Sequence, residues 1–332
     1  MKVAILGGGA WGTTLAQVLV DNGHEVLIYD NNLVHLNKIN QQMHPFFDVK
    51  ISPTIKGTAD LDKFLDFSSY LLIALPTASI RDVLYEINLK LKDKKVFINV
   101  SKGIEPETTK RVSQIVDEVI SKKYNGGYVL LTGPSHSEEV IVKKLTLLTS
   151  SSKDLNLAKE IQKMFSNNEY LRVYVNDDVV GAEVGGTAKN AIAVVSGAAT
   201  GLKLGENARA ALITRGSVEI VRVVEAMGGQ KETAYGLTGI GDLIVTASSE
   251  NSRNFRAGRR IGEGVPLEQV FLESEQTIEG VRSIIALHEY AEKEGLYLPI
   301  ISTAYRVLFE GLDVKEAIQK LLTGDLKEEK EI

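Results

Sequence analysis

Lys189 is the charged side chain whose setting in the sequence best suits chemistry. It lies in the run Gly-Gly-Thr-Ala-Lys-Asn, inside the long apolar stretch 179–202. Burial lowers the pKa of a lysine ammonium, which makes the group useful as an acid, a base or a partner for an oxyanion. Structural ion pairs also perturb pKa values, so the residue alone fits a catalytic and a structural role equally well.

A carboxylate and a second lysine can act with Lys189. Asp242 directly follows the glycine-containing turn 238–241, and Lys102 follows a predicted strand and precedes Gly103. Loops carry functional residues more often than cores do, although Lys102 also fits an ordinary surface lysine. Lys102 and Asp242 are therefore candidates for function beside Lys189.

Ser252, Arg253 and Asn254 form a second polar cluster, which begins ten residues after Asp242. A loop guanidinium beside hydroxyl and amide groups suits bidentate recognition of a phosphate. We interpret the arginines that follow as the solvated face of a helix, since charge runs usually face solvent. They are Arg256, Arg259 and Arg260.

Near the N-terminus, Gly7, Gly9 and Gly12 form the pattern G-x-G-x-x-G between a predicted strand (3–6) and a predicted helix (13–19). This is the context in which the pattern binds a dinucleotide. The first glycine allows a tight turn, the second lets a pyrophosphate approach the backbone, and the third lets the helix pack closely on the strand. The phosphates then lie at free N–H groups of the helix N-terminus.

Asp30 indicates which nucleotide to expect. It follows the predicted second strand (26–29) at about the 20-residue distance at which a carboxylate meets the ribose hydroxyls. A carboxylate there repels a 2′-phosphate, so we expect NAD rather than NADP, with Asn31 beside Asp30 in the cofactor site. Trp11, the only tryptophan, could simply pack the start of the helix, but within the glycine pattern we favour a role in shielding the cofactor.

Predicted strands and helices alternate along the first half of the chain, and they must position these residues. Short apolar runs separated by helical periodicity predict an α/β fold with a doubly wound, mainly parallel sheet and helices on both faces. Further strands are predicted at 70–75, 95–100, 128–132, 145–149 and 171–175, and helices at 79–89, 108–121, 135–142 and 155–165. Ligands bind at the carboxyl ends of such strands, so the loops that follow them should carry function. These loops are 75–77, 101–103 and 132–135, the last of which holds Ser135, a predicted helix N-cap.

From about Asp177 the chain shows helical periodicity with glycine interruptions and no convincing strand. The apolar stretch 179–202 carries charges near its middle, which favours a buried helix over a membrane span. Further helices are predicted at 207–227, 279–294, 302–310 and 314–322. We therefore predict a dinucleotide-binding domain over residues 1–178 and an all-α domain for substrate and catalysis over residues 179–332.

Composition excludes several classes of protein. The 332 residues suffice for two domains, and 44% hydrophobic with 24% charged residues is typical of a globular protein. The net charge of −5 argues against a nucleic-acid binder. The absence of cysteine excludes disulfides and thiolate chemistry, and five scattered histidines show no metal-ligand spacing. The apolar start is too short for a signal peptide, so we expect a cytoplasmic protein without membrane insertion.

The order of the motifs resembles that of one family. The chain contains, in order, G-G-G-A-W-G-T-T-L-A, S-K-G, G-P-S-H, V-G-G-T-A-K-N, R-A-A-L-I-T-R-G, G-I-G-D-L, S-R-N and I-E-G. This series resembles the NAD(P)-dependent glycerol-3-phosphate dehydrogenases of the bacterial type, from Met1 to about Gly324. The resemblance implies an N-terminal Rossmann domain, a helical C-terminal domain and a homodimer.

The resemblance also implies roles for individual residues. Lys189 matches the catalytic proton donor and acceptor of the family, and we predict that Lys102 and Asp242 are catalytic with it. The positions that match contacts to glycerol phosphate are Lys102, Gly133, Ser135, Asp242, Ser252, Arg253 and Asn254. The positions that match contacts to the nicotinamide cofactor are Ala10, Trp11, Lys102, Ser137, Arg253 and Glu279. The usual aromatic-Leu-Pro-Gly loop is altered to Pro-Phe-Phe-Asp-Val at 45–49, so we assign no adenine contact there.

The activity that the resemblance implies is hydride transfer between NAD(P)(H) and the pair sn-glycerol 3-phosphate and dihydroxyacetone phosphate, supplying glycerol 3-phosphate for phospholipid synthesis. One alternative is a dehydrogenase of the same architecture that acts on a hydroxy acid, which would not account for the wider set of motifs. The other is a non-catalytic NAD-sensing protein, which would have no reason to bring Lys189, Lys102 and Asp242 together.

Overall fold

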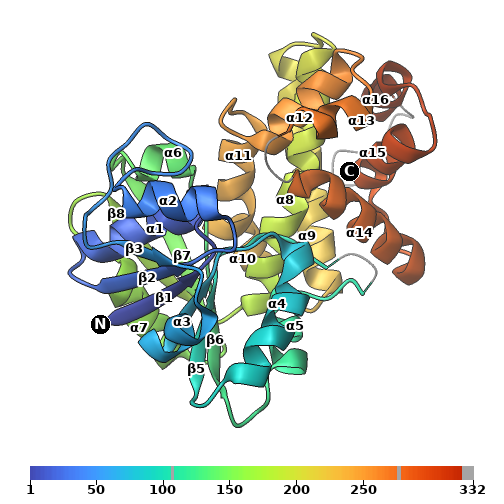
Figure 1. Cartoon of the computed structure of the whole chain (residues 1–332). Helices are drawn as coiled ribbons and strands as arrows, with labels where there is room; N and C mark the ends of the chain where they lie inside the picture. Colours follow the sequence, from blue (N-terminus) through green and yellow to red (C-terminus); the bar gives the residue numbers. More distant parts are fainter. Residues whose placement is uncertain (106–107, 275–277, 324–332) are drawn as a thin grey trace. The chain divides into compact units, whose positions relative to one another are not determined.

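A computed structural model describes residues 1–105, 108–274 and 278–323 (Figure 1). Its residues group into two compact units. The first comprises residues 1–101 and 111–179, and the second comprises residues 102–110 together with the chain from Val180 onward. Each unit has its own hydrophobic core.

The first unit is built on one eight-stranded sheet with the order β3-β2-β1-β4-β5-β6-β7-β8. Its strands are β1 (Lys2–Leu6), β2 (Glu25–Tyr29), β3 (Lys56–Thr58), β4 (Tyr70–Ile73), β5 (Lys95–Asn99), β6 (Asn125–Thr132), β7 (Thr146–Ser151) and β8 (Leu171–Asn176). Neighbouring strands are parallel except β6 and β7, which are antiparallel. The predicted doubly wound, mainly parallel sheet is therefore confirmed.

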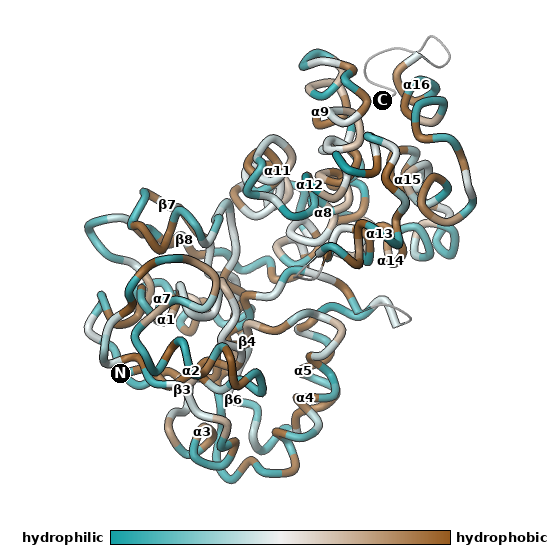
Figure 2. The backbone as a smooth tube through the Cα atoms, turned by 45° about the horizontal axis from the view of Figure 1, so that its top comes forward, coloured by the Kyte–Doolittle hydropathy of each residue, from teal (hydrophilic) through white to brown (hydrophobic). Residues whose placement is uncertain are grey.

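Helices bury both faces at the centre of this sheet, where strands β1 and β4 are almost entirely apolar and buried. Val3 and Ile5 of β1 pack in a core with α1 (Ala10–Asp21) and α7 (Leu155–Phe165). Ala4 and Leu6 pack in a second core with α3 (Leu61–Phe67), α4 (Thr77–Lys90) and α5 (Val112–Val119). In Figure 2 the tube is brown, hence hydrophobic, along strand β4. The helices of this unit are α1 (Ala10–Asp21), α2 (Leu33–Asn40), α3 (Leu61–Phe67), α4 (Thr77–Lys90), α5 (Val112–Val119), α6 (Ser137–Val140) and α7 (Leu155–Phe165).

Three elements of the first unit lie outside the sequence prediction, namely β3, α2 and α3. Strand β3 has only the three residues Lys-Gly-Thr, so it carries no apolar run. Helices α2 and α3 are eight and seven residues long, and each begins at a side-chain N-cap, Asn32 and Asp60. Their signal lies in the cap rather than in a long periodic pattern, which is why periodicity alone missed them.

The second unit is helical, and no strand occurs in its described part, in agreement with the prediction. Its elements are α8 (Val179–Gly201), α9 (Glu206–Ala226), α10 (Lys231–Tyr235), a π-helical turn η1 (Leu237–Gly241), α11 (Asp242–Ala247), α12 (Arg253–Gly262), α13 (Leu267–Leu272), α14 (Glu279–Glu294), α15 (Pro299–Phe309) and α16 (Val314–Thr323). Along α15 and α16 the tube in Figure 2 alternates between hydrophobic and hydrophilic colours, as expected of helices with one buried face.

Helix α8 is the central element of the second unit. Every residue from Gly181 to Ala199 is buried, which confirms the predicted buried helix. A helix that is apolar all round must be covered on all sides. Among the described helices, none is long and apolar enough to span a membrane.

Glycines set the distance between α8 and α12. Gly197 and Gly201 on α8 and Gly258 and Gly262 on α12 each repeat at a spacing of four residues. A Cβ atom on Gly258 would lie 1.9 Å from the carbonyl oxygen of Val194, far inside van der Waals contact. The corresponding distances are 2.2 Å from Gly262 to Ala198 O, 2.1 Å from Gly197 to Phe255 O and 2.2 Å from Gly201 to Arg259 O. The two backbones can approach this closely only because no side chain intervenes.

We expect Gly258→Ala to lower the free energy of unfolding by about 1–3 kcal/mol, since the added methyl group must push the two helices apart. Alanine's better helix propensity, worth about 1 kcal/mol, offsets only part of this. Urea denaturation measures the change. The matched control is Gly241→Ala, where an added Cβ would have its nearest neighbour at an ordinary 3.4 Å. Equal stability of the two variants would contradict close packing at Gly258.

Candidate active site

The carboxylate of Asp242 lies between two lysine ammonium groups in the second unit. Lys102 Nζ is 2.6 Å from Oδ2, and Lys189 Nζ is 3.1 Å from Oδ1. The Asp242 and Lys189 side chains are 2% and 6% exposed, whereas that of Lys102 is 19% exposed. The structure therefore brings together the three residues predicted to be catalytic, from three separate parts of the chain.

Thr246 completes this cluster, and sequence analysis missed it. Lys189 Nζ donates to Thr246 Oγ1 at 2.7 Å, and the hydroxyl donates to the carbonyl oxygen of Asp242 at 2.6 Å. Thr246 follows Asp242 by one helical turn of α11, a spacing that places two side chains on the same face. The four-residue spacing from Asp242 is the sequence signal that could have identified Thr246.

The electrostatics of the cluster differ between its two buried members. Burial lowers the pKa of the Lys189 ammonium to about 7, with Lys102 and Arg253 acting in the same direction and Asp242 opposing them. Burial by itself would raise the pKa of Asp242, but Lys102 and Lys189 outweigh burial and hold the pKa below its usual value. An ionised carboxylate thus faces a lysine that can gain or lose a proton near neutral pH.

Close backbone contacts place Asp242 against α8. A Cβ on Gly185 of α8 would lie 3.3 Å from the Cα atom of Gly239 in η1, and a Cβ on Gly239 would lie 2.0 Å from Ala234 O. Only glycine fits at Gly239. The π-helical turn ends at Gly241, and Asp242 then opens α11. Such turns occur frequently at functional sites because they redirect the residues that follow.

Ser252, Arg253 and Asn254 lie at the start of α12 rather than in a loop, which corrects the expected setting of Arg253. Ser252 is the N-cap and accepts a hydrogen bond from Phe255 N at 3.2 Å. The N-cap signature of Ser252 was present in the sequence. Arg253 is exposed in the first helical turn, where the N–H groups favour an anion.

Asn254 is buried and its side chain holds other parts of the same unit. Its Nδ2 atom donates to Asn190 Oδ1 at 2.9 Å, and its Oδ1 atom accepts from Gly280 N at 2.9 Å. Asn254 therefore connects the residue after Lys189 with the start of α14, where Glu279 is partly buried. These contacts give Asn254 a structural function beside any contact with a ligand.

The other arginines of α12 lie at the surface, in agreement with the prediction. Arg259 pairs with Glu250 and Glu263, and Arg260 pairs with Glu273. Arg256 is exposed and donates to the carbonyl oxygen of Glu250.

In the first unit, the glycine pattern lies at the turn from β1 to α1. Gly7 has φ +109°, and a Cβ on it would lie 2.5 Å from Ala74 O. A Cβ on Gly12 would lie 2.0 Å from Gly7 O, so the helix can pack here only without a side chain. Gly9, in contrast, has open space where a Cβ would stand, and no side chain caps the N-terminus of α1. The turn therefore fits the phosphates of a dinucleotide.

Asp30 follows β2 and contacts this glycine turn. Its Oδ2 atom accepts a hydrogen bond from Gly8 N at 2.8 Å, and Oδ1 accepts from Asn32 N at 2.8 Å. Asn31 is exposed beside it. Ala10 and Trp11 are the first residues of α1. Trp11 is half-buried because part of its side chain packs against the core that contains Val3 and Ile5.

Gly133, Ser135 and Ser137 lie in the loop after β6 and at the start of α6. Gly133 has φ +149° and is buried. The prediction that Ser135 is a helix N-cap is wrong, because His136 occupies that position and Ser135 Oγ donates to Gly133 O at 3.0 Å. This local hydrogen bond to the backbone two residues earlier holds the Ser135 hydroxyl in the loop. Ser137 Oγ contacts Glu138 at 3.2 Å.

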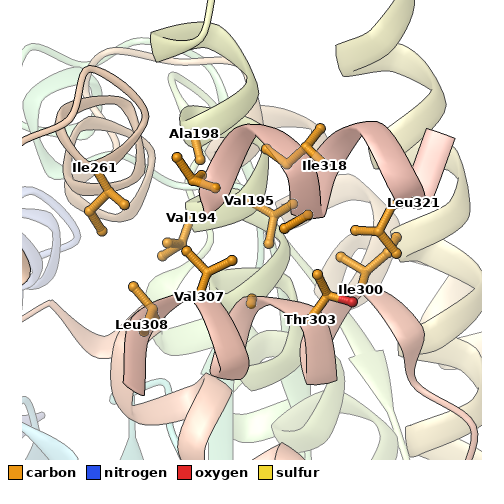
Figure 3. Close-up of a pocket in the computed structure, with 13 residues that line it drawn as sticks. Val194, Val195, Ala198, Ile261, Ile300, Thr303, Val307, Leu308, Ile318 and Leu321 are labelled. Carbon is orange, nitrogen blue, oxygen red and sulfur yellow. The ribbon is translucent and has the colours of Figure 1, made fainter. Parts of the chain in front are cut away.

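Metal ligands and cavities limit the chemistry that the described residues can support. Among them, no three His, Asp or Glu side chains gather in a way that could hold a metal ion. An apolar hollow in the second unit lies between side chains of α8, α12, α15 and α16 (Figure 3). Thr303 is the only residue with a polar side chain among those that line it, so the hollow offers no acid, base or nucleophile.

Comparison with known proteins gives a match over nearly the whole chain. The family model described as the N-terminus of NAD-dependent glycerol-3-phosphate dehydrogenase matches residues 2–158, and the model for its C-terminus matches residues 178–319.

Individual relatives agree with this match. A glycerol-3-phosphate dehydrogenase (NAD(P)+) of Acholeplasma laidlawii is 59% identical over 329 residues, which cover 99% of both chains. A protein of the same name from Phytoplasma australiense is 50% identical over 310 residues, covering 93% of this chain and 94% of the relative. The crystal structure of glycerol-3-phosphate dehydrogenase from Coxiella burnetii is 32% identical with a TM-score of 0.92, covering 97% of this chain and 98% of that one.

We expect Asp242→Asn to lower the pKa of Lys189 further below about 7, because the carboxylate favours the charged ammonium. The pKa can be measured by NMR from the pH-dependent shift of the methylene carbon next to Lys189 Nζ. Glu250→Gln, which removes one of the two exposed partners of Arg259, serves as the control and should leave this titration unchanged. An unaltered titration of Lys189 in Asp242→Asn would show that the pair does not interact electrostatically.

Proposed function

The chain belongs to the family of NAD-dependent glycerol-3-phosphate dehydrogenases, and on this premise we propose that it interconverts sn-glycerol 3-phosphate and dihydroxyacetone phosphate. The single observation that carries the assignment of catalytic residues is the cluster of Lys189, Asp242 and Lys102. A buried lysine whose pKa lies near neutrality, held by an ionised carboxylate, suits an acid and base that works in both directions.

The nicotinamide cofactor supplies the hydride that the C2 carbonyl carbon of dihydroxyacetone phosphate takes up when both are bound. Lys189 donates a proton to the carbonyl oxygen as negative charge develops on it, and accepts that proton in the reverse reaction. The ammonium of Lys102 stabilises the same charge. Asp242 orients both lysines, and Thr246 accepts one N–H of Lys189 so that another can face the substrate oxygen.

Arg253 is our candidate for binding the substrate phosphate. It is exposed at the N-terminus of a ten-residue helix, and its charge contributes to the lowered pKa of Lys189. Ser252 supports this helix start as its cap, and Asn254 positions Asn190 beside Lys189. We assign Gly133 and Ser135 to the same substrate from the resemblance of their loop to the family motif.

We assign cofactor binding to the glycine turn of the first unit, with Asp30 as the ribose acceptor, and we infer a preference for NAD over NADP. The remaining contacts are proposed from the family motifs. They are Ala10, Trp11, Asn31, Lys102, Ser137, Arg253 and Glu279. We also infer that residues 1–178, apart from 102–110, form the nucleotide domain, and that residues 179–332 together with 102–110 form the catalytic domain of a cytoplasmic homodimer.

The alternatives fit less well. A non-catalytic NAD sensor has no use for two lysines on one buried carboxylate. A hydroxy-acid dehydrogenase could bind a carboxylate at Arg253, but family membership over both halves of the chain favours the phosphorylated substrate.

We expect NADH oxidation when dihydroxyacetone phosphate is added, and a loss of about 10²–10⁴-fold in kcat for Lys189→Ala, the range typical of a lost general acid. Absorbance at the NADH band measures both. Lys231→Ala, at an exposed position of α10, is the matched control and should keep the activity of the unmodified protein. No turnover, or undiminished turnover in Lys189→Ala, would end the assignment.

We expect kcat/KM to be higher for NADH than for NADPH, and the ratio of the two to fall about ten-fold in Asp30→Asn, since a neutral side chain no longer repels a 2′-phosphate. Steady-state kinetics with each cofactor give the ratio. Asp93→Asn changes an exposed carboxylate before β5 and controls for net charge. Equal kcat/KM for the two cofactors in the unmodified protein would show that Asp30 does not select.

A further inference from the structure

A chain of hydrogen bonds connects the start of α2 with the glycine turn. It begins at Asn32, the N-cap of α2, whose Oδ1 atom accepts from Val34 N at 2.9 Å and from His35 N at 3.4 Å. These two donors fix the orientation of the Asn32 amide, so that its Nδ2 atom is the one that faces His35.

The Asn32 amide in turn fixes the tautomer of His35. Asn32 Nδ2 lies 3.3 Å from His35 Nε2, and an amide nitrogen can only donate, so Nε2 accepts. The proton of the neutral ring is then on Nδ1, which lies 3.1 Å from Asp30 Oδ2. An ionised carboxylate can only accept, which agrees with this assignment.

Asp30 therefore receives hydrogen bonds from three sides. Oδ2 accepts from His35 and from Gly8 N, and Oδ1 accepts from Asn32 N. A carboxylate has roughly four acceptor positions, so about one is left for a ribose hydroxyl. The side chains of Asp30 and His35 are 11% and 24% exposed, so both can be reached by a ligand.

His35 is itself held in place by the loop that departs from the family motif. The ring of Phe46 packs against the His35 imidazole with 5.1 Å between centroids. Lys38, one turn further along α2, donates to the carbonyl oxygen of Pro45 at 2.8 Å and so ties this loop to the helix. The imidazole is thus held by the tilted ring of Phe46 and by contacts at both of its nitrogens.

We propose that His35 is a positioning residue for cofactor choice, which fixes Asp30 so that its remaining acceptor position meets the ribose and its charge faces a 2′-phosphate. The inference rests on the proposed function, because it presumes that the glycine turn binds a nicotinamide dinucleotide. Without the imidazole, the carboxylate keeps one backbone donor on each oxygen, but Oδ2 loses its second donor and is held less firmly. Asp30 then loses part of its hydrogen bonding to the ribose and part of its repulsion of a 2′-phosphate.

Direct binding of NADH and NADPH to purified protein, followed by cofactor fluorescence, tests the proposal without requiring turnover. The variants are His35→Leu, which removes the donor, and His35→Asn, whose side-chain amide can donate from nearly the position of Nδ1. His24→Leu is the control, since His24 also lies in the first unit but contacts Met164 O rather than Asp30. The melting temperature of each variant is measured alongside.

In His35→Leu we expect the Kd for NADH to rise about ten-fold and the Kd for NADPH to rise less than about three-fold. The ratio of the Kd for NADPH to the Kd for NADH therefore falls. His35→Asn should restore most of the ratio, and His24→Leu should leave it unchanged. A merely structural role would lower the melting temperature and raise both Kd values by the same factor, and that result overturns the inference. Failure of the unmodified protein to bind either cofactor overturns the proposed function itself.

Discussion

The ionised carboxylate of Asp242, buried between two ammonium groups, is the constraint on which the second unit depends. A buried charge is costly unless it is paired, and Asp242 is paired twice while Thr246 also lies against it. The pairing keeps Lys189 in a buried position that would otherwise favour its neutral form. The result is a lysine near the midpoint of its titration at neutral pH, which is what reversible proton transfer requires.

Glycines supply the geometry that this pairing needs. Helix α8 carries Lys189 and approaches helix α12 at distances that exclude side chains, and a Cβ on Gly185 would lie 3.3 Å from the π-helical turn before Asp242. The same principle operates in the first unit, where Gly7 and Gly12 let the first strand and helix pack closely. In both units the backbone comes close where chemistry is expected, and the surrounding apolar residues fix its position.

The two units use carboxylates in a similar way. Asp242 forms ion pairs with two lysines. Asp30 accepts hydrogen bonds from the backbone of the glycine turn and from the imidazole of His35. Each has most of its acceptor positions filled by the protein. A carboxylate held in this way presents its remaining lone pairs in fixed directions. It can therefore distinguish ligands by the position of their hydrogen-bond donors as well as by their charge.

The sequence by itself determined the class of fold, the glycine turn with its carboxylate, and the identity of the three charged residues, because these depend on local patterns and motifs. Periodicity identified α8 and the major strands, but it missed α2, α3 and β3, which are too short for a periodic signal. Only the tertiary structure decided that Lys102, Lys189 and Asp242 share one cluster with Thr246, that Ser135 is not a cap, and that Asn254 holds Asn190. Asp242 lies 140 positions from Lys102, and Thr246 and Asn254 lie 57 and 64 positions from their partners on α8. Contacts between residues so far apart are set by how helices pack, and no local pattern records that packing.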